Sequence, residues 1–398
     1  MQSITEPTEA QLNSIVQPYL DNAPSDCGLG IAIGYAGLGF SGIYLRGSLF
    51  NGAQPPYLLN QAGQTFALTN DTPFELASIS KTFTATLYSL LIPNAQKQNP
   101  TLGDFPLNIG GQFQSIPIET LVNYTSGLPA DNDTVTDLPP FLPAPYSTPG
   151  MLGFLNLTNI EPKPFGTVSA YSNLGFAIAS AVLPFLDGDG DGTSSYEALI
   201  QSQIWQQLGF SGNTSFFTNV RLDQLPLGYD VVDQTWTPAP AGSKELPAYD
   251  GAGGVVSTPN DMMKWLQFNM GIQQNAVLSP LLAALQNPST NVTYNAAGIG
   301  LGWFMKKQVS TTSPYPAIFK DGGLDGVSTY IAFVPGQQPL IMPPPVMPSP
   351  AGVFPSPAGV FVLTNSNGLC NSAGNTEMSE AVAYNVLNIM QGYSLVPY

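Results

Sequence analysis

The chain has 398 residues, contains no histidine, and carries 26 acidic against 10 basic residues, which gives a formal net charge of −16. The missing histidine excludes a Ser-His-Asp triad, a Cys-His dyad and nearly every common zinc site. The negative charge argues against nucleic acid or an anionic membrane surface as a partner.

Charged residues make up only 9% of the chain, far below the usual quarter. No run of about 18 apolar residues is present, so no membrane span is expected. Six N-x-[ST] sequons occur, at Asn70, Asn123, Asn132, Asn156, Asn213 and Asn291. Together these features favour a secreted, extracellular glycoprotein over an ordinary acidic protein. Because the chain begins Met1-Gln-Ser-Ile-Thr and no signal peptide is visible, the sequence is interpreted as a mature form, with a cytoplasmic chain as the alternative.

The first quarter of the chain predicts a helix at 9–20, strands at 28–35 and 40–48, and a loop at 50–73 that leads into a second helix. The second helix has apolar residues at a spacing of four, which predicts one buried face. These residues are Ile79, Phe83, Leu87 and Leu91.

Ser78 and Lys81 lie three residues apart at the start of this helix, so they share a face that differs from the apolar one. A helix start offers backbone N–H groups and a positive dipole end to a developing anion. A buried lysine can have a pKa low enough to accept a hydroxyl proton. The pair therefore predicts a nucleophile and its base, although an ordinary capped helix with an exposed lysine fits this stretch alone.

The middle of the chain predicts a helix near 117–124, a turn at 125–129 and an irregular stretch at 130–150. Tyr171-Ser172-Asn173 then opens a helix of small and apolar residues, which Pro184 ends. Further helices are predicted at 196–208 and from Thr258, the expected N-cap.

An acidic stretch between two of these helices is similar to the first half of a calcium loop. Asp187, Asp189 and Asp191 take positions 1, 3 and 5, and Gly192 takes position 6. Ala198 stands at the twelfth position, where such loops have a bidentate glutamate. Two interpretations remain open, a weak calcium site and a flexible acidic turn before a helix.

The last hundred residues predict an antiparallel sheet. The expected strands are 298–305, 317–323, 327–334 and 360–364, and a helix at 377–390 closes the chain. A proline-rich stretch at 336–358 holds a tandem heptapeptide. Because proline cannot donate to a strand ladder, most of it is expected to be a surface loop without an assigned function.

Three motifs stand in order along the chain: Ser78-x-x-Lys81, Tyr171-Ser172-Asn173 and Lys320-Asp321-Gly322. This order resembles the serine β-lactamase and penicillin-binding-protein superfamily. The tyrosine in the second motif is similar to class C β-lactamases, family VIII esterases and D-aminopeptidases. Further landmarks of the resemblance cover nearly the whole chain, at 125–129, 253–258, 300–303 and 362–365.

The resemblance implies roles for the first two motifs. Ser78 would be the acylated nucleophile, and Lys81 and Tyr171 would share the general-base and general-acid work, with adjacent lysine charges favouring the tyrosine phenolate. Asn173 would bind the acyl side of the substrate and Lys81. No cofactor is needed.

The third motif would contact the substrate. Lys320 would keep the field of the site positive, and Asp321 and Gly322 would line the substrate site. The oxyanion hole would consist of the backbone N–H groups of Ser78 and Gly323.

The resemblance also implies an α/β (α+β) fold of the β-lactamase/transpeptidase type. An antiparallel sheet flanked by helices would come from 1–75 and 290–398, a mostly helical lobe would come from 76–289, and the site would lie at their junction. The first strand would then lie beside the last, which brings Cys27 near Cys370 and favours a disulfide over two inert thiols.

Two residues depart from the family pattern. Asp321 stands where threonine or serine is frequent, and an ionised aspartate would repel a substrate carboxylate. This counts against efficient β-lactam hydrolysis and mildly favours esters or amine-bearing substrates. Tyr124 replaces a frequent histidine, and its role is expected to be structural.

The sequence thus predicts a serine hydrolase that forms an acyl-enzyme with a small-molecule ester or amide. Three alternatives stay open: a β-lactamase or D-amino-acid peptidase or carboxypeptidase, an acyltransferase, and a non-catalytic binding protein on the same fold. The sequence predicts no oligomeric state.

Overall fold

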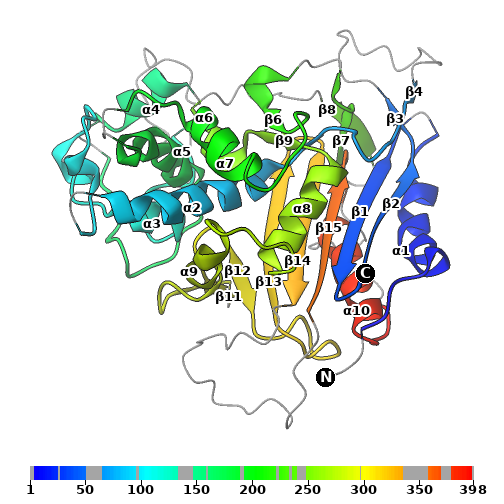
Figure 1. The fold of residues 1–398 in the computed structure, drawn as a ribbon. Helices are drawn as coiled ribbons and strands as arrows, with labels where there is room; N and C mark the ends of the chain where they lie inside the picture. The colour runs from blue at the N-terminus through cyan, green and yellow to red at the C-terminus, as the bar shows by residue number, and fades with distance from the viewer. Residues whose placement is uncertain are drawn as a thin grey trace.

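A computed structural model of the chain shows a mixed α/β architecture (Figure 1). It describes residues 4–25, 27–50, 65–95, 98–132, 147–157, 160–188, 192–220, 224–232, 235–239, 248–295, 297–334, 357–368 and 378–396. Its centre is an eight-stranded sheet in the order β10-β11-β12-β13-β14-β15-β1-β2. Every neighbouring pair in this sheet is antiparallel, which confirms the predicted fold class.

The strands of the large sheet come from both ends of the described chain. They are β1 (Gly30–Gly37), β2 (Phe40–Gly47), β10 (Thr293–Tyr294), β11 (Ala297–Ile299), β12 (Phe304–Lys306), β13 (Ala317–Leu324), β14 (Val327–Val334) and β15 (Ala358–Thr364). The first strand lies beside the last, as predicted, with Ile31 opposite Thr364. The pairing does not fix the lobe boundaries at 75, 76, 289 and 290, which stay a prediction.

Helices cover both faces of this sheet. Helix α8 (Pro259–Asn269) lies in front of it and α10 (Met378–Met390) behind it, with α1 (Glu9–Asn22) beside α10 (Figure 1). Every residue of β14 and β15 is buried as a result. A strand buried on both faces is nearly continuously apolar, as these two sequences are.

The helical part surrounds α2 (Ser80–Leu91), the helix that follows Ser78. Its neighbours are α3 (Ile118–Val122), α5 (Asn173–Val182), α6 (Tyr196–Ile200), α7 (Asp250–Gly253) and α9 (Leu282–Gln286). The predicted apolar face is buried, but so is the rest of the helix except Leu90. Threonine hydroxyls on the other face are satisfied inside the protein; Thr84, for example, donates to the Gly251 carbonyl at 2.6 Å.

The strand predicted at 298–305 is wrong, because this stretch forms the hairpin β11–β12. Gly302 has a φ of +75°, and a side chain at Gly300 would place its Cβ 2.4 Å from the Leu285 carbonyl oxygen. An alternation of glycine with apolar residues fits both a strand and this turn, so the pattern does not distinguish the two. Only the close approach of α9 and α2 requires the glycines.

Other elements differ from the prediction in their bounds. The loop at 50–73 includes β4 (Thr65–Phe66) and the end of β3 (Leu49–Phe50), and α4 (Thr148–Phe154) begins inside the stretch predicted to be irregular. The helix predicted at 196–208 consists of α6 followed by a π-helical turn at Gln201–Trp205. The helix from Thr258 is confirmed, with the Thr258 side chain accepting from Asp261 N–H.

Three predictions lie at least partly outside the described residues: the Cys27–Cys370 disulfide at Cys370, the calcium loop at Asp189 and Asp191, and most of the proline-rich stretch. The Asp187 carboxylate accepts from the Ser194 hydroxyl at 3.2 Å and from the Gln203 amide at 3.0 Å. Among the described residues, no three or more His, Cys, Asp or Glu side chains form a group that could hold a metal ion.

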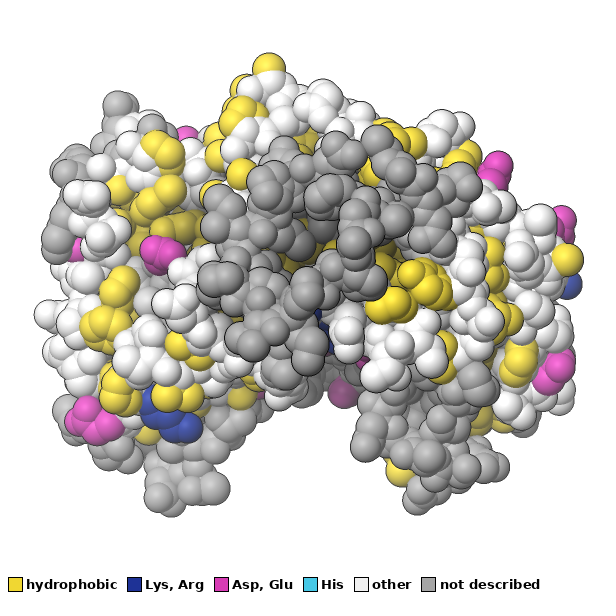
Figure 2. Space-filling model, turned by 90° about the horizontal axis from the view of Figure 1, so that it is seen from below, with side chains coloured by type: hydrophobic (Ala, Val, Ile, Leu, Met, Phe, Trp, Pro, Cys, Tyr) yellow, Lys and Arg dark blue, Asp and Glu magenta, His cyan; other side chains and the backbone are white. Residues whose placement is uncertain are grey.

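The surface carries few charges, as the composition requires. Among the side chains that Figure 2 colours, most are apolar or uncharged polar, and Lys/Arg and Asp/Glu side chains are visible at depth in a recess toward the lower middle of the face. Within the part of the chain that the structure describes, no helix has the length and hydropathy to cross a membrane.

Candidate active site

Ser78 lies in a 3-10 turn, η1 (Ala77–Ile79), between the short strand β5 (Phe74–Glu75) and α2. It therefore precedes the helix proper by two residues and faces its N-terminal end. Ala77 has a φ of +48°. The left-handed region costs a residue with a side chain roughly 1–2 kcal/mol, so the surrounding structure must hold this turn in place.

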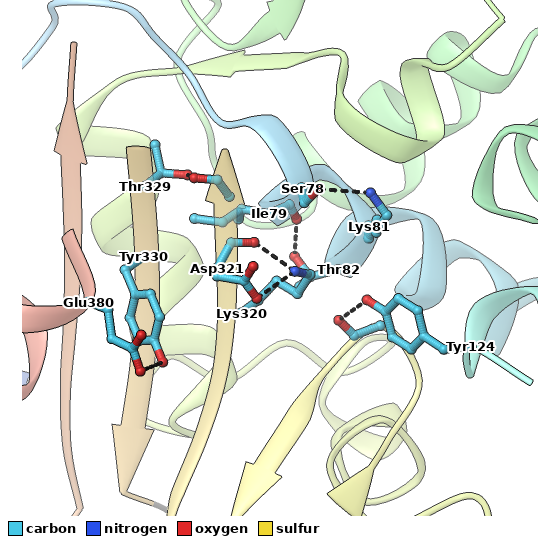
Figure 3. A network of polar contacts seen from close by, with 12 residues as sticks. Ser78, Ile79, Lys81, Thr82, Tyr124, Lys320, Asp321, Thr329, Tyr330 and Glu380 are labelled. Atoms are coloured by element: carbon cyan, nitrogen blue, oxygen red, sulfur yellow. Dashed lines mark hydrogen bonds and ion pairs between the residues drawn. The ribbon is translucent and has the colours of Figure 1, made fainter. Parts of the chain in front are cut away.

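Two strands hold the turn from opposite sides. Leu76 N–H donates to the Val255 carbonyl of β9 (Val255–Ser257) at 2.8 Å, and the Thr329 hydroxyl of β14 donates to the Leu76 carbonyl at 2.9 Å (Figure 3). Gly322 of β13 lies directly against this turn. A Cβ at Gly322 would be 2.5 Å from the Leu76 carbonyl oxygen and 2.3 Å from the Thr329 hydroxyl. The third motif thus needs glycine at this position to bring β13 close to Ser78.

Lys81 is fully buried and points at Ser78 (Figure 3). Its Nζ lies 2.9 Å from Ser78 Oγ, 2.7 Å from Asn173 Oδ1 and 2.6 Å from the Ala252 carbonyl oxygen. Burial first, and then the charge of Lys320, hold the pKa of Lys81 well below its ordinary value. A neutral amine can donate to Asn173 and Ala252 and keep its lone pair for the Ser78 proton.

Tyr171 lies between the two lysines of the site. Its ring centroid is 5.0 Å from Lys81 Nζ and 5.2 Å from Lys320 Nζ. Burial raises the pKa of this phenol, and Lys320 lowers it only in part, so the net direction is upward. Lys320 thus acts on Tyr171 in the expected direction, but burial outweighs it.

Lys320 and Asp321 form an ion pair on β13. Lys320 is fully buried, whereas the Asp321 side chain is 46% exposed, and Lys320 Nζ donates to Asp321 Oδ1 at 2.9 Å. Burial alone would lower the pKa of Lys320, but Asp321 and Tyr171 raise it above its ordinary value. Burial would raise the pKa of Asp321, but the Lys320 ammonium lowers it. Both groups are charged at neutral pH, which keeps a cation beside Tyr171.

Asn173 is the first residue of α5, which is capped by Ser172 through a 2.9 Å hydrogen bond from Gly175 N–H. The cap directs the Asn173 side chain toward Lys81. Asn173 Nδ2 donates to Asp131 Oδ2 at 3.4 Å, so the amide oxygen faces Lys81. No sequence motif indicated Asp131 as a site residue. Its position just after the predicted turn at 125–129 could have indicated it.

Tyr124 supports Tyr171, which confirms the structural role expected for it. The two rings stack with centroids 5.3 Å apart, and Phe304 stacks on Tyr124 at 4.7 Å. The Tyr124 hydroxyl donates to the Gly302 carbonyl at 3.3 Å. A buried aromatic residue therefore fixes the plane of the Tyr171 ring.

A cavity of about 560 Å³ opens in front of Ser78. Its described lining consists of Ser78, Tyr171, Asn173, Tyr294, Asn295, Ala297, Phe304, Lys306, Phe319, Asp321, Gly323, Tyr330 and Glu380. Ser78 and Gly323 share this wall, as an oxyanion hole between them requires. Gly322 and Lys320 are not part of the lining, so a direct substrate contact by either stays a prediction.

No motif indicated Lys306, Tyr330 or Glu380. They come from β12, β14 and α10, and Lys306 Nζ lies 2.9 Å from Glu380 Oε1. Only the register of the strands and the packing of α10 bring them to one cavity.

The arrangement can carry out nucleophilic acyl substitution. It combines a hydroxyl, a buried amine of lowered pKa within hydrogen-bond distance and a phenol that can pass a proton. These are the features that a serine hydrolase without histidine requires.

Comparisons with known proteins also indicate a serine hydrolase. The family model described as Beta-lactamase matches residues 56–383, and the chain belongs to this family of serine hydrolases. The chain is 25% identical over 286 residues to the unguisins hydrolase ungD' of Aspergillus campestris, covering 67% of this chain and 51% of that protein. It is 26% identical over 295 residues to the D-alanyl-D-alanine-carboxypeptidase/endopeptidase AmpH of Escherichia coli strain K12, covering 67% and 68%.

A solved structure of similar fold is the class C beta lactamase from Rhodobacter sphaeroides. The TM-score is 0.69 at 20% identity, covering 96% of this chain and 99% of the other. This likeness concerns the fold alone. The match to the fungal hydrolase spans only about half of that protein's length.

Proposed function

We propose that this protein hydrolyses small carboxylic esters or small amides through an acyl-enzyme on Ser78. One observation carries the proposal: the Lys81 amine is fully buried and lies 2.9 Å from Ser78 Oγ. Because its pKa is held well below the ordinary value, the amine can accept the hydroxyl proton. A protein that only binds ligands has no need to bury an amine beside a hydroxyl.

In acylation, Lys81 takes the Ser78 proton while Ser78 Oγ attacks the substrate carbonyl. The N–H groups of Ser78 and Gly323 stabilise the oxyanion. Tyr171, whose pKa is raised by burial, gives its proton to the leaving group, and the Lys81 ammonium restores it. The leaving group departs and Ser78 carries the acyl group.

In deacylation, the same groups work in reverse on water. Tyr171 and Lys81 take a proton from the attacking water, and Ser78 recovers its proton when the acyl–oxygen bond breaks. If an alcohol or amine occupies the place of water, the same steps transfer the acyl group, so acyl transfer needs only a better acceptor.

The charge of Asp321 bears on the substrate. The Lys320 ammonium keeps this half-exposed carboxylate ionised, and it repels a substrate carboxylate. We therefore place esters and small amides ahead of β-lactams. The peptide bond of a D-amino acid is the second candidate substrate. The relative AmpH is named as a D-alanyl-D-alanine-carboxypeptidase/endopeptidase, and the match covers 67% of this chain and 68% of AmpH.

The test is a burst experiment with a chromogenic ester, together with fluorophosphonate labelling. We expect a burst, one label on Ser78, and a loss of turnover of about a thousandfold or more in Ser78→Ala. Parallel assays with nitrocefin and a D-alanyl amide separate the ester, β-lactam and peptide activities. Full activity in Ser78→Ala, with an unchanged thermal unfolding temperature, would exclude the proposal.

We also propose that the protein is secreted, glycosylated and linked by a Cys27–Cys370 disulfide. The low charge content and four sequons with exposed asparagines support this: Asn70, Asn156, Asn213 and Asn291. Asn123 and Asn132 are buried and hydrogen-bonded, so glycans there are excluded in the folded protein. Mass analysis with and without glycosidase and reductant tests both modifications.

A further inference from the structure

The cavity in front of Ser78 extends to a second polar group that the proposed reaction does not use. We name it the far-wall group and define it as Lys306, Tyr330 and Glu380. Glu380 Oε1 lies 2.9 Å from Lys306 Nζ and accepts from the Tyr330 hydroxyl at 3.4 Å. All three residues line the same cavity as Ser78.

The far-wall group adjoins Asp321 through the sheet. Asp321 of β13 and Tyr330 of β14 are directly opposite each other in the antiparallel ladder, so their side chains share one face. Figure 3 shows Tyr330 and Glu380 on one side of Asp321 and Ser78 on the other. A substrate acylating Ser78 would extend past Asp321 toward Glu380.

The exposed charges of this wall are mainly negative. Lys320 is fully buried, so the Lys320–Asp321 pair presents its carboxylate, 46% exposed, to the cavity. The Lys306 and Glu380 side chains are 31% and 27% exposed. Each carboxylate uses one oxygen for its lysine, and among the described residues no other side chain donates to the second oxygen, Oδ2 of Asp321 or Oε2 of Glu380.

Lys306 is poorly placed to bind an anion. Its ammonium lies 4.9 Å from the ring centroids of both Phe319 and Tyr384, and it donates to Glu380. Cation–π contacts and the ion pair together hold it. The protein's net charge of −16 adds a field that attracts cations to the cavity.

We propose that the carboxylates of Asp321 and Glu380 bind the ammonium group of an amine-bearing ester or amide substrate. The second oxygens of the two carboxylates accept from the ammonium, and the rings of Phe319 and Tyr330, stacked with centroids 5.7 Å apart, contact the chain that carries it. This inference rests on the proposed hydrolysis at Ser78 and specifies its substrate.

The test uses three acyl donors with the same chain length and the same nitrophenyl leaving group. They end in a primary ammonium, a methyl group or a carboxylate. We expect kcat/KM to be about tenfold higher for the ammonium donor than for the methyl donor, equivalent to about 1.4 kcal/mol, and lowest for the carboxylate donor. Glu380→Gln should lower the ammonium-to-methyl ratio several-fold without a matching fall for the methyl donor.

Lys306→Gln and Lys307→Gln form a matched pair of variants. Both remove one positive charge, but Lys307 is exposed and does not line the cavity. Lys306→Gln should raise the ammonium-to-methyl ratio, because Glu380 loses its partner, and Lys307→Gln should leave the ratio unchanged. An equal change in both would mean that only the overall charge matters, which contradicts the proposal.

The outcomes separate the two proposals. If no donor acylates Ser78, the proposed hydrolysis fails. If all three are hydrolysed with dependence on Ser78, but the ammonium donor is not preferred or Glu380→Gln leaves the ratio unchanged, only the ammonium site is refuted.

Discussion

The catalytic side and the substrate side of the cavity differ in how deeply their ionisable side chains are buried. On the catalytic side, Lys81 is fully buried and its pKa is strongly lowered. On the substrate side, Asp321, Lys306 and Glu380 are each between a quarter and a half exposed and paired. Burial lowers the pKa of the amine that takes the proton, whereas partial exposure lets the opposite wall keep the charges that select a substrate.

The largest expected effect is on the catalytic side. Lys81→Met should lower kcat/KM by about a thousandfold, within the range for losing a general base. In the wild type, kcat/KM should fall as the pH drops below the pKa of Lys81, because the protonated amine accepts no proton. Since that pKa is well below its ordinary value, the acidic limb lies well below that of an exposed lysine.

The pH profile of the variant completes this test. Lys81→Met should lose the acidic limb along with the rate, and Lys307→Met, at an exposed lysine, should keep both. If Lys81→Met retained the acidic limb of the pH profile, the base would be another group, and the contrast between the two sides would not hold.

Gly322 lies where the catalytic side meets the substrate side, and a side chain at this position should separate the two. The Cβ of Gly322→Ala would lie 2.5 Å from the Leu76 carbonyl oxygen, so β13 must move away from the turn that holds Ser78. Because Gly323 moves with it, we expect kcat to fall about a hundredfold, as when one oxyanion donor is lost.

Gly39→Ala is the matched control for Gly322→Ala. Gly39 has a φ of +93° in the β1–β2 hairpin, and a Cβ there would meet no atom within 4 Å among the described residues outside its chain neighbours. Alanine at this position therefore costs roughly 1–2 kcal/mol of stability through its backbone conformation alone. Its kcat should not change. Equal kcat losses in the two variants would show that general destabilisation, not displacement of β13, explains the effect.

The same contrast explains what could be predicted from the sequence. Ser78, Lys81 and Tyr171 lie in short motifs near helix starts, and the order of these motifs together with the family resemblance was sufficient to select them and to predict the antiparallel fold. Lys306 and Glu380 are 74 residues apart, and their contact depends on strand register and on where α10 packs. The net direction of the Tyr171 pKa shift could not be predicted, because neighbouring charges can be inferred from motifs but the extent of burial cannot.

A smaller effect on activity is expected where the catalytic side is supported by packing. Tyr124→Leu removes the ring that stacks on Tyr171 at 5.3 Å. An aromatic pair contributes about 0.5–1.5 kcal/mol beyond its buried area, so kcat should fall by roughly threefold to tenfold with little change in KM. Tyr124→Phe keeps the stack and should retain nearly full activity; equal losses in both would assign the effect to the hydroxyl bond with Gly302.

The last expected effect is on stability and not on activity. Asp250 begins α7, whose Ala252 carbonyl accepts from Lys81, and burial, then repulsion from Glu197, raises its pKa to about 8. Since the folded pKa lies above the unfolded value of 3.8, the folded state holds this proton more tightly. The stability it contributes is therefore complete below about pH 4 and is lost as the pH rises toward 8, at up to about 1.4 kcal/mol per pH unit.

Thermal unfolding at several pH values measures this dependence. Asp250→Asn should flatten the fall in unfolding temperature between pH 5 and 8 (about the window between the two pKa values), whereas Asp21→Asn, at an exposed carboxylate on α1, should leave the slope as it is. An unchanged slope in Asp250→Asn would mean that this carboxyl is already ionised in the folded protein. The helix whose Ala252 carbonyl accepts from Lys81 would then hold a buried negative charge, and low polarity on the catalytic side would no longer account for the lowered pKa of Lys81.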